Sequence, residues 1–274
     1  MGDITEKHMP LIENATIRKL RAGGLALGFG VHHLRTAAAG MLAAATGHDW
    51  LFIDLEHGAF SQDDVAQICI AALPTGITPI VRVCAGALDE ATRALDNGAA
   101  GVIVPHVDTI DQARRIASAF RYPPLGSRSW GGPSALFGYQ APGSAEAQAA
   151  INPEILVVAM IESPEAVANA AGIAAVEGID GLLIGTSDLT AEMGISGQIL
   201  HPRVEEAYRS VGAACRKAGK FLGMGGVYEL DAMKHYVDLG VHFILTGSDH
   251  AYILAGAKTQ SAFFRKLEAD RKAS

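Results

Sequence analysis

The sequence lacks the features of secreted and membrane-spanning proteins. Its three cysteines, Cys69, Cys84 and Cys215, are scattered and stand beside apolar residues. Isolated thiols in odd number indicate reduced cysteines in the cytoplasm rather than a disulfide framework. No apolar run is long enough to span a membrane, and the polar N-terminus has no hydrophobic segment of a signal peptide. We therefore expect a cytoplasmic protein with no membrane contact.

Basic residues are also scarce. The net charge is −7, which gives no reason to expect a nucleic acid or an anionic membrane as partner. No lysine or arginine occurs between Arg128 and Arg203, which disfavours coenzyme A and sugar phosphates as substrates. None of the lysines falls at the C-terminal end of a predicted strand. Because a Schiff-base mechanism needs a lysine in the site, the sequence disfavours this class of enzyme.

What is present is a regular alternation of apolar strands and helical patterns over 274 residues, of which 49% are hydrophobic. Eight strands separated by helices predict a single-domain (β/α)8 barrel over residues 1–274, with a doubly wound sheet as the main alternative. The predicted strands are Ala26–Val31, Trp50–Glu56, Thr78–Val83, Gly101–Val107, Ile155–Glu162, Gly181–Gly185, Phe221–Gly225 and Val241–Thr246. The predicted helices are Leu34–Thr46, Gln62–Ala72, Ala87–Asn97, Ile110–Phe120, Pro164–Val176, Arg203–Ala218, Glu229–Leu239 and Asp249–Glu268.

Three further segments depart from this alternation. Residues 10–22 have helical spacing and are expected to close the bottom of the barrel. Residues 123–153 are rich in Gly, Pro, Ser and Ala, and a connection of this length is often a lid over a barrel site. The C-terminal segment, residues 249–274, is longer than a barrel helix needs, and Phe263 and Phe264 are expected to pack on a neighbouring subunit.

Two predicted strands end in carboxylates. Glu162 closes the fifth strand, and Asp188 follows the sixth after a crossover long enough for one helix. Parallel strands place their C-terminal ends on the same side, so both carboxylates should face one small volume. Since two neighbouring carboxylates repel each other unless a cation lies between them, the pair predicts a site for a hard divalent metal. In the alternative, Asp188 only caps a helix over Leu189–Met193.

Two basic side chains accompany this pair. Arg82 lies within an apolar strand and needs an anionic partner. It either holds a substrate carboxylate or enolate oxygen, or forms a structural pair with Asp54 or Glu56. His57 follows the second strand and is either a general base or a turn residue.

Other polar residues give weaker signals. Asp96 could orient a histidine base from the end of the third helix, but its position is weak evidence. His32, His33 and His106 are expected to be structural or substrate-lining rather than catalytic. Gly226 and Gly247 are expected to turn the chain tightly or to let backbone approach a ligand.

Several segments in a fixed order resemble one enzyme family. Together they are similar to the class II, metal-dependent 4-hydroxy-2-oxo-acid (pyruvate) aldolases of the HpcH/HpaI type, within the phosphoenolpyruvate/pyruvate barrel superfamily. The resemblance covers roughly residues 15–255. The matching segments are Trp50–His57, Pro79–Arg82, Ala94–Gly98, Val102–Pro105, Arg121–Gly126, Ile161–Glu162, Val176–Gly181 and Ser187–Leu189.

The resemblance implies an active site and a reaction. Glu162 and Asp188 would hold Mg2+, Mn2+ or Co2+ with no organic cofactor, and Arg82 would contact the keto oxygen of pyruvate. His57 and Asp96 would form a proton-transfer dyad. The reaction would join pyruvate to an aldehyde, or cleave a 4-hydroxy-2-oxo acid, through a metal-stabilised enolate.

The resemblance also implies supporting residues and an assembly. Asp54 and Glu56 would hold water molecules on the metal, and the backbone amides near Ser187 and Asp188 would receive the substrate carboxylate. Related enzymes are hexamers that exchange their last helix between subunits. The main alternative activity is an oxaloacetate decarboxylase or a citrate-lyase-like enzyme, and a non-catalytic barrel is a third possibility.

The sequence departs from the family pattern in three places. Gly185-Thr186-Ser187 replaces a Gly-Pro segment, and His106 follows Pro105 where related chains often carry Met. The stretch after Gly131 lacks the arginine that relatives use for acidic aldehydes. We therefore expect a neutral or apolar aldehyde. It would lie near aromatic and apolar residues of the long connection, unless these residues only pack the lid or a subunit interface. They are Trp130, Leu136, Phe137 and Tyr139.

Overall fold

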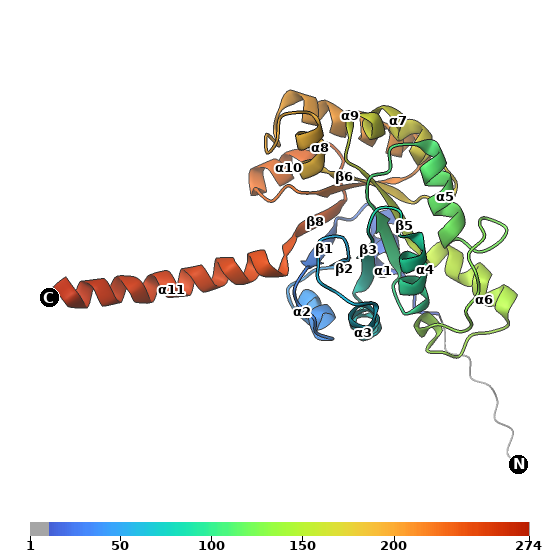
Figure 1. The fold of residues 1–274 in the computed structure, drawn as a ribbon, viewed down its shortest axis with the longest axis horizontal. Coiled ribbons are helices and arrows are strands. Elements are labelled where there is room, and N and C mark those ends of the chain that lie inside the picture. Colours follow the sequence, from blue (N-terminus) through green and yellow to red (C-terminus); the bar gives the residue numbers. More distant parts are fainter. Residues whose placement is uncertain (1–10, 274) are drawn as a thin grey trace, which may run out of the picture.

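The computed structural model describes residues 11–273, and eight parallel strands close into a barrel in sequence order (Figure 1). This confirms the (β/α)8 prediction over the doubly wound alternative. The expectations for residues 1–10 and for residue 274 lie outside the described residues. The strands are β1 (Ala26–Val31), β2 (Trp50–Asp54), β3 (Thr78–Arg82), β4 (Gly101–Val104), β5 (Leu156–Ile161), β6 (Gly181–Gly185), β7 (Phe221–Gly225) and β8 (Phe243–Ser248).

The α-helices follow the predicted order, with three differences. The second begins at Ala39 rather than Leu34, because the residues before it form turns, and neither α6 nor α8 was among the predicted helices. The helices are α1 (Ala15–Arg21), α2 (Ala39–Ala45), α3 (Gln62–Ala72), α4 (Leu88–Asp96), α5 (Ile110–Phe120), α6 (Ser144–Ile151), α7 (Pro164–Ala174), α8 (Thr186–Glu192), α9 (Pro202–Ala218), α10 (Leu230–Asp238) and α11 (Asp249–Ala273).

Large side chains fill the barrel interior, so the barrel is a packed core and not a pore. Trp50 stacks on Phe243 with ring centroids 4.1 Å apart. Gly28 makes room for this pair, because a Cβ there would lie 2.3 Å from the Trp50 ring. Helix α1 closes the bottom as predicted, with Ile17 and Leu20 buried against the barrel interior.

The long connection, residues 123–153, lies at the opposite end of the barrel from the strand C-termini. It leads from the end of α5 to the start of β5, and each barrel helix returns the chain to the N-terminal ends of the strands. It also contacts the segment before α1, where the Ile12 amide donates to the Leu136 carbonyl at 2.8 Å. The prediction of a lid over this chain's own site is therefore wrong, because connections on that end follow helices, not strands.

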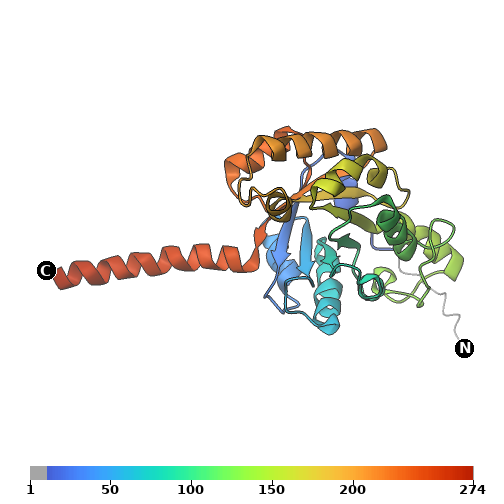
Figure 2. The ribbon, with the colours of Figure 1, turned by 45° about the horizontal axis from the view of Figure 1, so that its top comes forward.

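Helix α11 leaves the barrel and projects into solvent in both views (Figures 1 and 2). Of its 25 residues only Asp249 is buried, which confirms a C-terminal helix longer than the barrel requires. The exposed helix carries large apolar side chains, among them Ile253, Phe263 and Phe264. Within residues 11–273, no helix has both the length and the apolar character to cross a membrane.

Candidate active site

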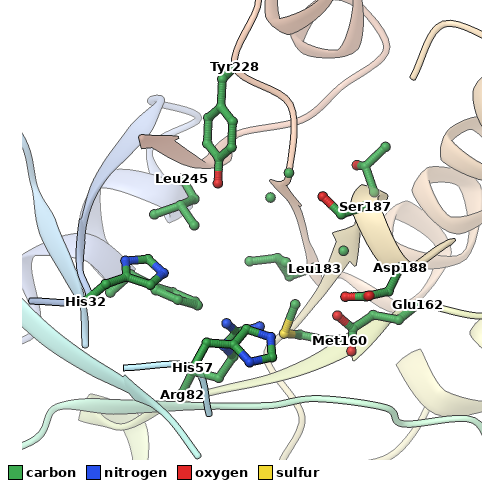
Figure 3. A pocket seen from close by; sticks show the side chains of 15 residues that line it. His32, His57, Arg82, Met160, Glu162, Leu183, Ser187, Asp188, Tyr228 and Leu245 are labelled. Atoms are coloured by element: carbon green, nitrogen blue, oxygen red, sulfur yellow. The ribbon is translucent and has the colours of Figure 1, made fainter. Parts of the chain in front are cut away.

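A cavity of about 260 Å³ opens among the C-terminal ends of the strands (Figure 3). Five predicted site residues line it, from four different barrel units, as expected for a barrel whose chemistry lies at this end. They are His57, Arg82, Glu162, Ser187 and Asp188.

The predicted carboxylate pair forms. Glu162 directly follows β5, Asp188 lies in the first turn of α8, and Figure 3 shows their carboxylates side by side. Glu162 is buried, and its Oε2 accepts a hydrogen bond from the His106 amide at 2.8 Å. Gly185 allows this position, since a Cβ there would lie 2.3 Å from Oε1 of Glu162. Because α8 begins at Thr186, Asp188 is inside the helix, which excludes the alternative of a capping residue.

The electrostatics of the pair fit a bound cation. Burial raises the pKa of Glu162 to about 7, and the neighbouring charge of Asp188 adds to this rise against the opposing His106 contacts. A divalent ion between the two carboxylates would favour the ionised form of both. The oxygen donor set suits hard cations such as Mg2+ and Mn2+.

Arg82 forms the ion pairs with Asp54 and Glu56 that the sequence left open, and its contact with a substrate stays a prediction. Arg82 lines the cavity, and its guanidinium donates two hydrogen bonds to Asp54, from Nε at 2.9 Å and from Nη2 at 2.7 Å. Its Nη1 lies 3.0 Å from Oε2 of Glu56. Burial would lower the pKa of Arg82, but the two carboxylates outweigh it and raise the pKa above its ordinary value. The guanidinium is thus a fixed cation at the cavity wall.

Asp54 holds Arg82 in place. Its side chain is fully buried, and Oδ2 also lies 3.0 Å from Nε2 of His32. Burial would raise the pKa of Asp54, yet the bonds from His32 and Arg82 hold it well below its usual range. Both oxygens of Asp54 have partners within the protein, and its role in holding water on a metal stays a prediction. Oε1 of Glu56 is less committed, lying 3.8 Å from Nε2 of His106.

The structure separates His57 from Asp96. His57 is exposed at the cavity, whereas Asp96 is the last residue of α4 and lies at the opposite, N-terminal end of the barrel. There its carboxylate bonds to Nη2 of Arg128 at 2.7 Å. The prediction that His57 and Asp96 form a dyad is therefore wrong within one chain. Asp96 ends α4, which has already led the chain back to the N-terminal ends of the strands.

The residues expected around the aldehyde lie elsewhere. Leu136 and Phe137 are buried in the core between strands and helices, and Trp130 packs edge-on against Tyr122 at 5.6 Å. Trp130, Leu136 and Phe137 all belong to the long connection at the far end of the barrel. The prediction that the aldehyde lies beside them is therefore wrong within one chain. Trp130 remains a substrate contact by prediction only.

Tyr228 lines the cavity without having been expected there, and His106 contacts Glu162 from outside the cavity lining. Tyr228 follows β7, and its hydroxyl points into the cavity opposite Arg82 (Figure 3), a placement with no signal in the sequence. His106, expected to be structural or substrate-lining, adopts φ 53° and so turns its amide onto Glu162. The positive φ occurs at the residue after Pro105, but the sequence does not show which acceptor the His106 amide will bind.

Fold and site together define a (β/α)8 barrel with a buried carboxylate pair in a cavity at the C-terminal ends of its strands. Residues 33–255 match the family model described as HpcH/HpaI aldolase/citrate lyase, and the chain belongs to this family. The chain is accordingly an aldolase, a carbon–carbon lyase.

Three known proteins illustrate the similarity. The chain is 35% identical to the 4-hydroxy-4-methyl-2-oxoglutarate aldolase tasA of Hapsidospora irregularis, over 96% of this chain and 99% of that protein. It is 34% identical to a hydroxypyruvate/pyruvate aldolase of Delftia acidovorans, over 87% and 88% of the two chains. The crystal structure of an HpcH/HpaI aldolase from Desulfitobacterium hafniense DCB-2 superposes with a TM-score of 0.83 at 28% identity, covering 92% and 95%.

Proposed function

We propose that the enzyme forms or cleaves 4-hydroxy-2-oxo acids, with pyruvate and an aldehyde as the other partners, and that Glu162 and Asp188 hold Mg2+, Mn2+ or Co2+. The supporting observation is the buried carboxylate pair in one cavity with Arg82. A metal bound there would act as a Lewis acid on the substrate carbonyl. The similarity to curated aldolases supports the substrate class.

Arg82 is the group that stabilises negative charge on the substrate oxygen. Two of the five N–H groups of its guanidinium donate to Asp54, and Nη1 lies 3.0 Å from Glu56. N–H groups not engaged by these carboxylates would bind an oxyanion without reorganisation, because the carboxylates already fix the guanidinium plane. Glu56 could additionally orient water near the metal.

Ser187 and Asp188 would bind the carboxylate of pyruvate through their backbone amides in the first turn of α8. Gly226, with φ +79°, keeps this approach open, because a Cβ there would lie 2.7 Å from Oγ of Ser187. This agrees with the expectation that Gly226 permits a tight turn and a close approach of backbone.

His57 is proposed to transfer the proton at the aldehyde oxygen. Replacing it in His57→Ala should lower kcat about 100-fold or more while KM for pyruvate changes little, because a general base contributes mainly to the transition state. Steady-state kinetics would measure both constants, and added imidazole should restore part of kcat. His33→Ala, an exposed histidine outside the cavity lining, is the control. An unaltered kcat in His57→Ala would assign proton transfer to another group.

Metal removal tests the proposed function directly. We expect protein stripped with a chelator to lose pyruvate release from 4-hydroxy-2-oxo acids, and Mg2+, Mn2+ or Co2+ to restore it, because the ion is the Lewis acid of the reaction. The measurement is pyruvate release over a panel with and without a distal carboxylate on the aldehyde half. Retained activity in stripped protein would refute the proposal. Activity confined to oxaloacetate would instead identify a decarboxylase.

The same panel tests the acceptor. The expected preference is for a neutral or apolar aldehyde, and a clear preference for the distal acid would contradict it. The named substrate of the Hapsidospora relative carries two carboxylates, so this comparison separates the chain from that relative.

We propose further that the protein is a cytoplasmic homo-oligomer, a hexamer or trimer of dimers, in which α11 packs on a neighbouring copy. An exposed helix with Ile253, Phe263 and Phe264 is costly in water and needs an apolar partner surface. The double variant Phe263→Ser/Phe264→Ser should therefore have a smaller mass by light scattering. A matched control is Lys266→Ser on the same exposed helix. An unchanged mass in the double variant would exclude packing through this helix.

A further inference from the structure

A second group of potential ligands lies across the cavity from the carboxylate pair. His32, Asp249 and His250 offer ligand atoms that all lie within 4.8 Å of one another. His32 follows β1, and Asp249 and His250 begin α11 after β8. Figure 3 places His32 on the opposite side of the cavity from Glu162 and Asp188, so the two groups are distinct.

The Nδ1 atom of His32 is available to bind a metal ion. Its Nε2 lies 3.0 Å from Oδ2 of Asp54, while its Nδ1 is buried and has no hydrogen-bond partner. A carboxylate on one nitrogen fixes the tautomer with the proton on that side and leaves the lone pair on the other. Histidines that bind metals are commonly held by a carboxylate in this way. An unpartnered buried ring nitrogen is otherwise costly.

One carboxylate oxygen of Asp249 accepts fewer hydrogen bonds from the backbone than the other and can still bind a metal ion. The Oδ2 atom accepts three backbone N–H groups from residues 32–34, whereas the Oδ1 atom accepts a single backbone N–H, that of His250, at 2.7 Å. Nδ1 of His250 lies 3.4 Å from this same Oδ1. Two ligands of a tetrahedral zinc ion with bonds of about 2.0–2.1 Å lie about 3.3 Å apart. These two atoms therefore already have the spacing of neighbouring ligands.

We propose that His32, Asp249 and His250 form a second divalent metal site, selective for zinc-like ions. Two imidazoles and one carboxylate are ligands that Zn2+, Co2+ and Ni2+ prefer, whereas Mg2+ prefers the all-oxygen pair of Glu162 and Asp188. Three protein ligands leave a coordination position for water or a substrate oxygen. The ion would also join the loop after β1 to the start of α11. The proposal is independent of the aldolase reaction.

The test is binding of Zn2+ to folded protein in saturating Mg2+, followed by calorimetry. We expect one Zn2+ per chain, with affinity lowered about 100-fold in His250→Ala and little changed in His33→Ala. His33 is the matched control, because its ring lies 5.2 Å from that of His250 but it is not one of the three ligands. Zn2+ should also raise the Tm of the wild type by about 5 °C at a 100-fold excess over Kd, and not that of His250→Ala.

Two further variants separate the sites. Glu162→Gln should keep Zn2+ binding, since that residue belongs to the other pair. Co2+ added in place of Zn2+ should give the intense visible absorption of a four-coordinate site, and His250→Ala should lose it. Absence of Zn2+ binding in the presence of Mg2+, equal affinity in His250→Ala, or loss of binding in Glu162→Gln would each overturn the proposal. Circular dichroism would show that His250→Ala is folded.

Discussion

The variant Glu162→Gln should lose aldolase activity by about 1,000-fold or more while remaining folded. The amide is a neutral and weaker metal ligand, so the ion that polarises the substrate carbonyl would no longer be held. Folding should tolerate the change, because glutamine has the same shape and removes a buried charge whose pKa is already raised to about 7. Pyruvate release and Mn2+ binding by electron paramagnetic resonance would measure the two losses together.

A matched control for this variant lies three residues away. Glu165 is an exposed acid in the first turn of α7, and Glu165→Gln makes the same chemical change outside the cavity. It should keep both activity and Mn2+ affinity within about twofold, since surface substitutions of this kind have small effects. Parallel losses in both variants would mean that net charge, rather than a ligand, explains the result. Mn2+ binding retained in Glu162→Gln would remove Glu162 from the metal site.

The sequence predicts the strand ends well because the apolar runs stop at defined residues. Glu162 and Arg82 each lie at the C-terminal end of a long buried run, and the parallel order of strands then places them at one cavity. The barrel also follows from counting these runs. Predictions that depend on this rule alone agree with the structure.

Other predictions failed where the sequence does not say which end of the barrel a segment occupies. Asp96 ends a helix and the long connection, residues 123–153, follows one, so both lie at the end away from the cavity. Tyr228 has no pattern to mark it, because a loop residue reaches the cavity only through the path of the backbone. Helix α11 projects from the barrel with exposed apolar side chains, and its packing on a neighbouring subunit stays a prediction.

Replacing Arg82 should separate its structural role from its chemical role. In Arg82→Ala, the fully buried Asp54 loses its cationic partner and keeps only His32 and the backbone amides of Glu56 and His57, so the free energy of unfolding should fall by about 3–5 kcal/mol. In Arg82→Lys the charge remains, so the loss of stability should be smaller. The lysine ammonium cannot donate two hydrogen bonds to Asp54 and also bind the substrate oxygen, so kcat/KM should still fall about 100–1,000-fold.

Chemical denaturation and steady-state kinetics on both variants would measure these effects. Arg114→Ala provides the control, because the Arg114 side chain is 68% exposed and its pair with Asp111 is on the surface. Its unfolding free energy should change by less than about 1 kcal/mol. Wild-type kcat/KM in Arg82→Lys would show that the guanidinium only holds Asp54 and Glu56 in place. A large loss of kcat/KM in a stably folded Arg82→Lys would instead show that the fork itself stabilises negative charge on the substrate oxygen.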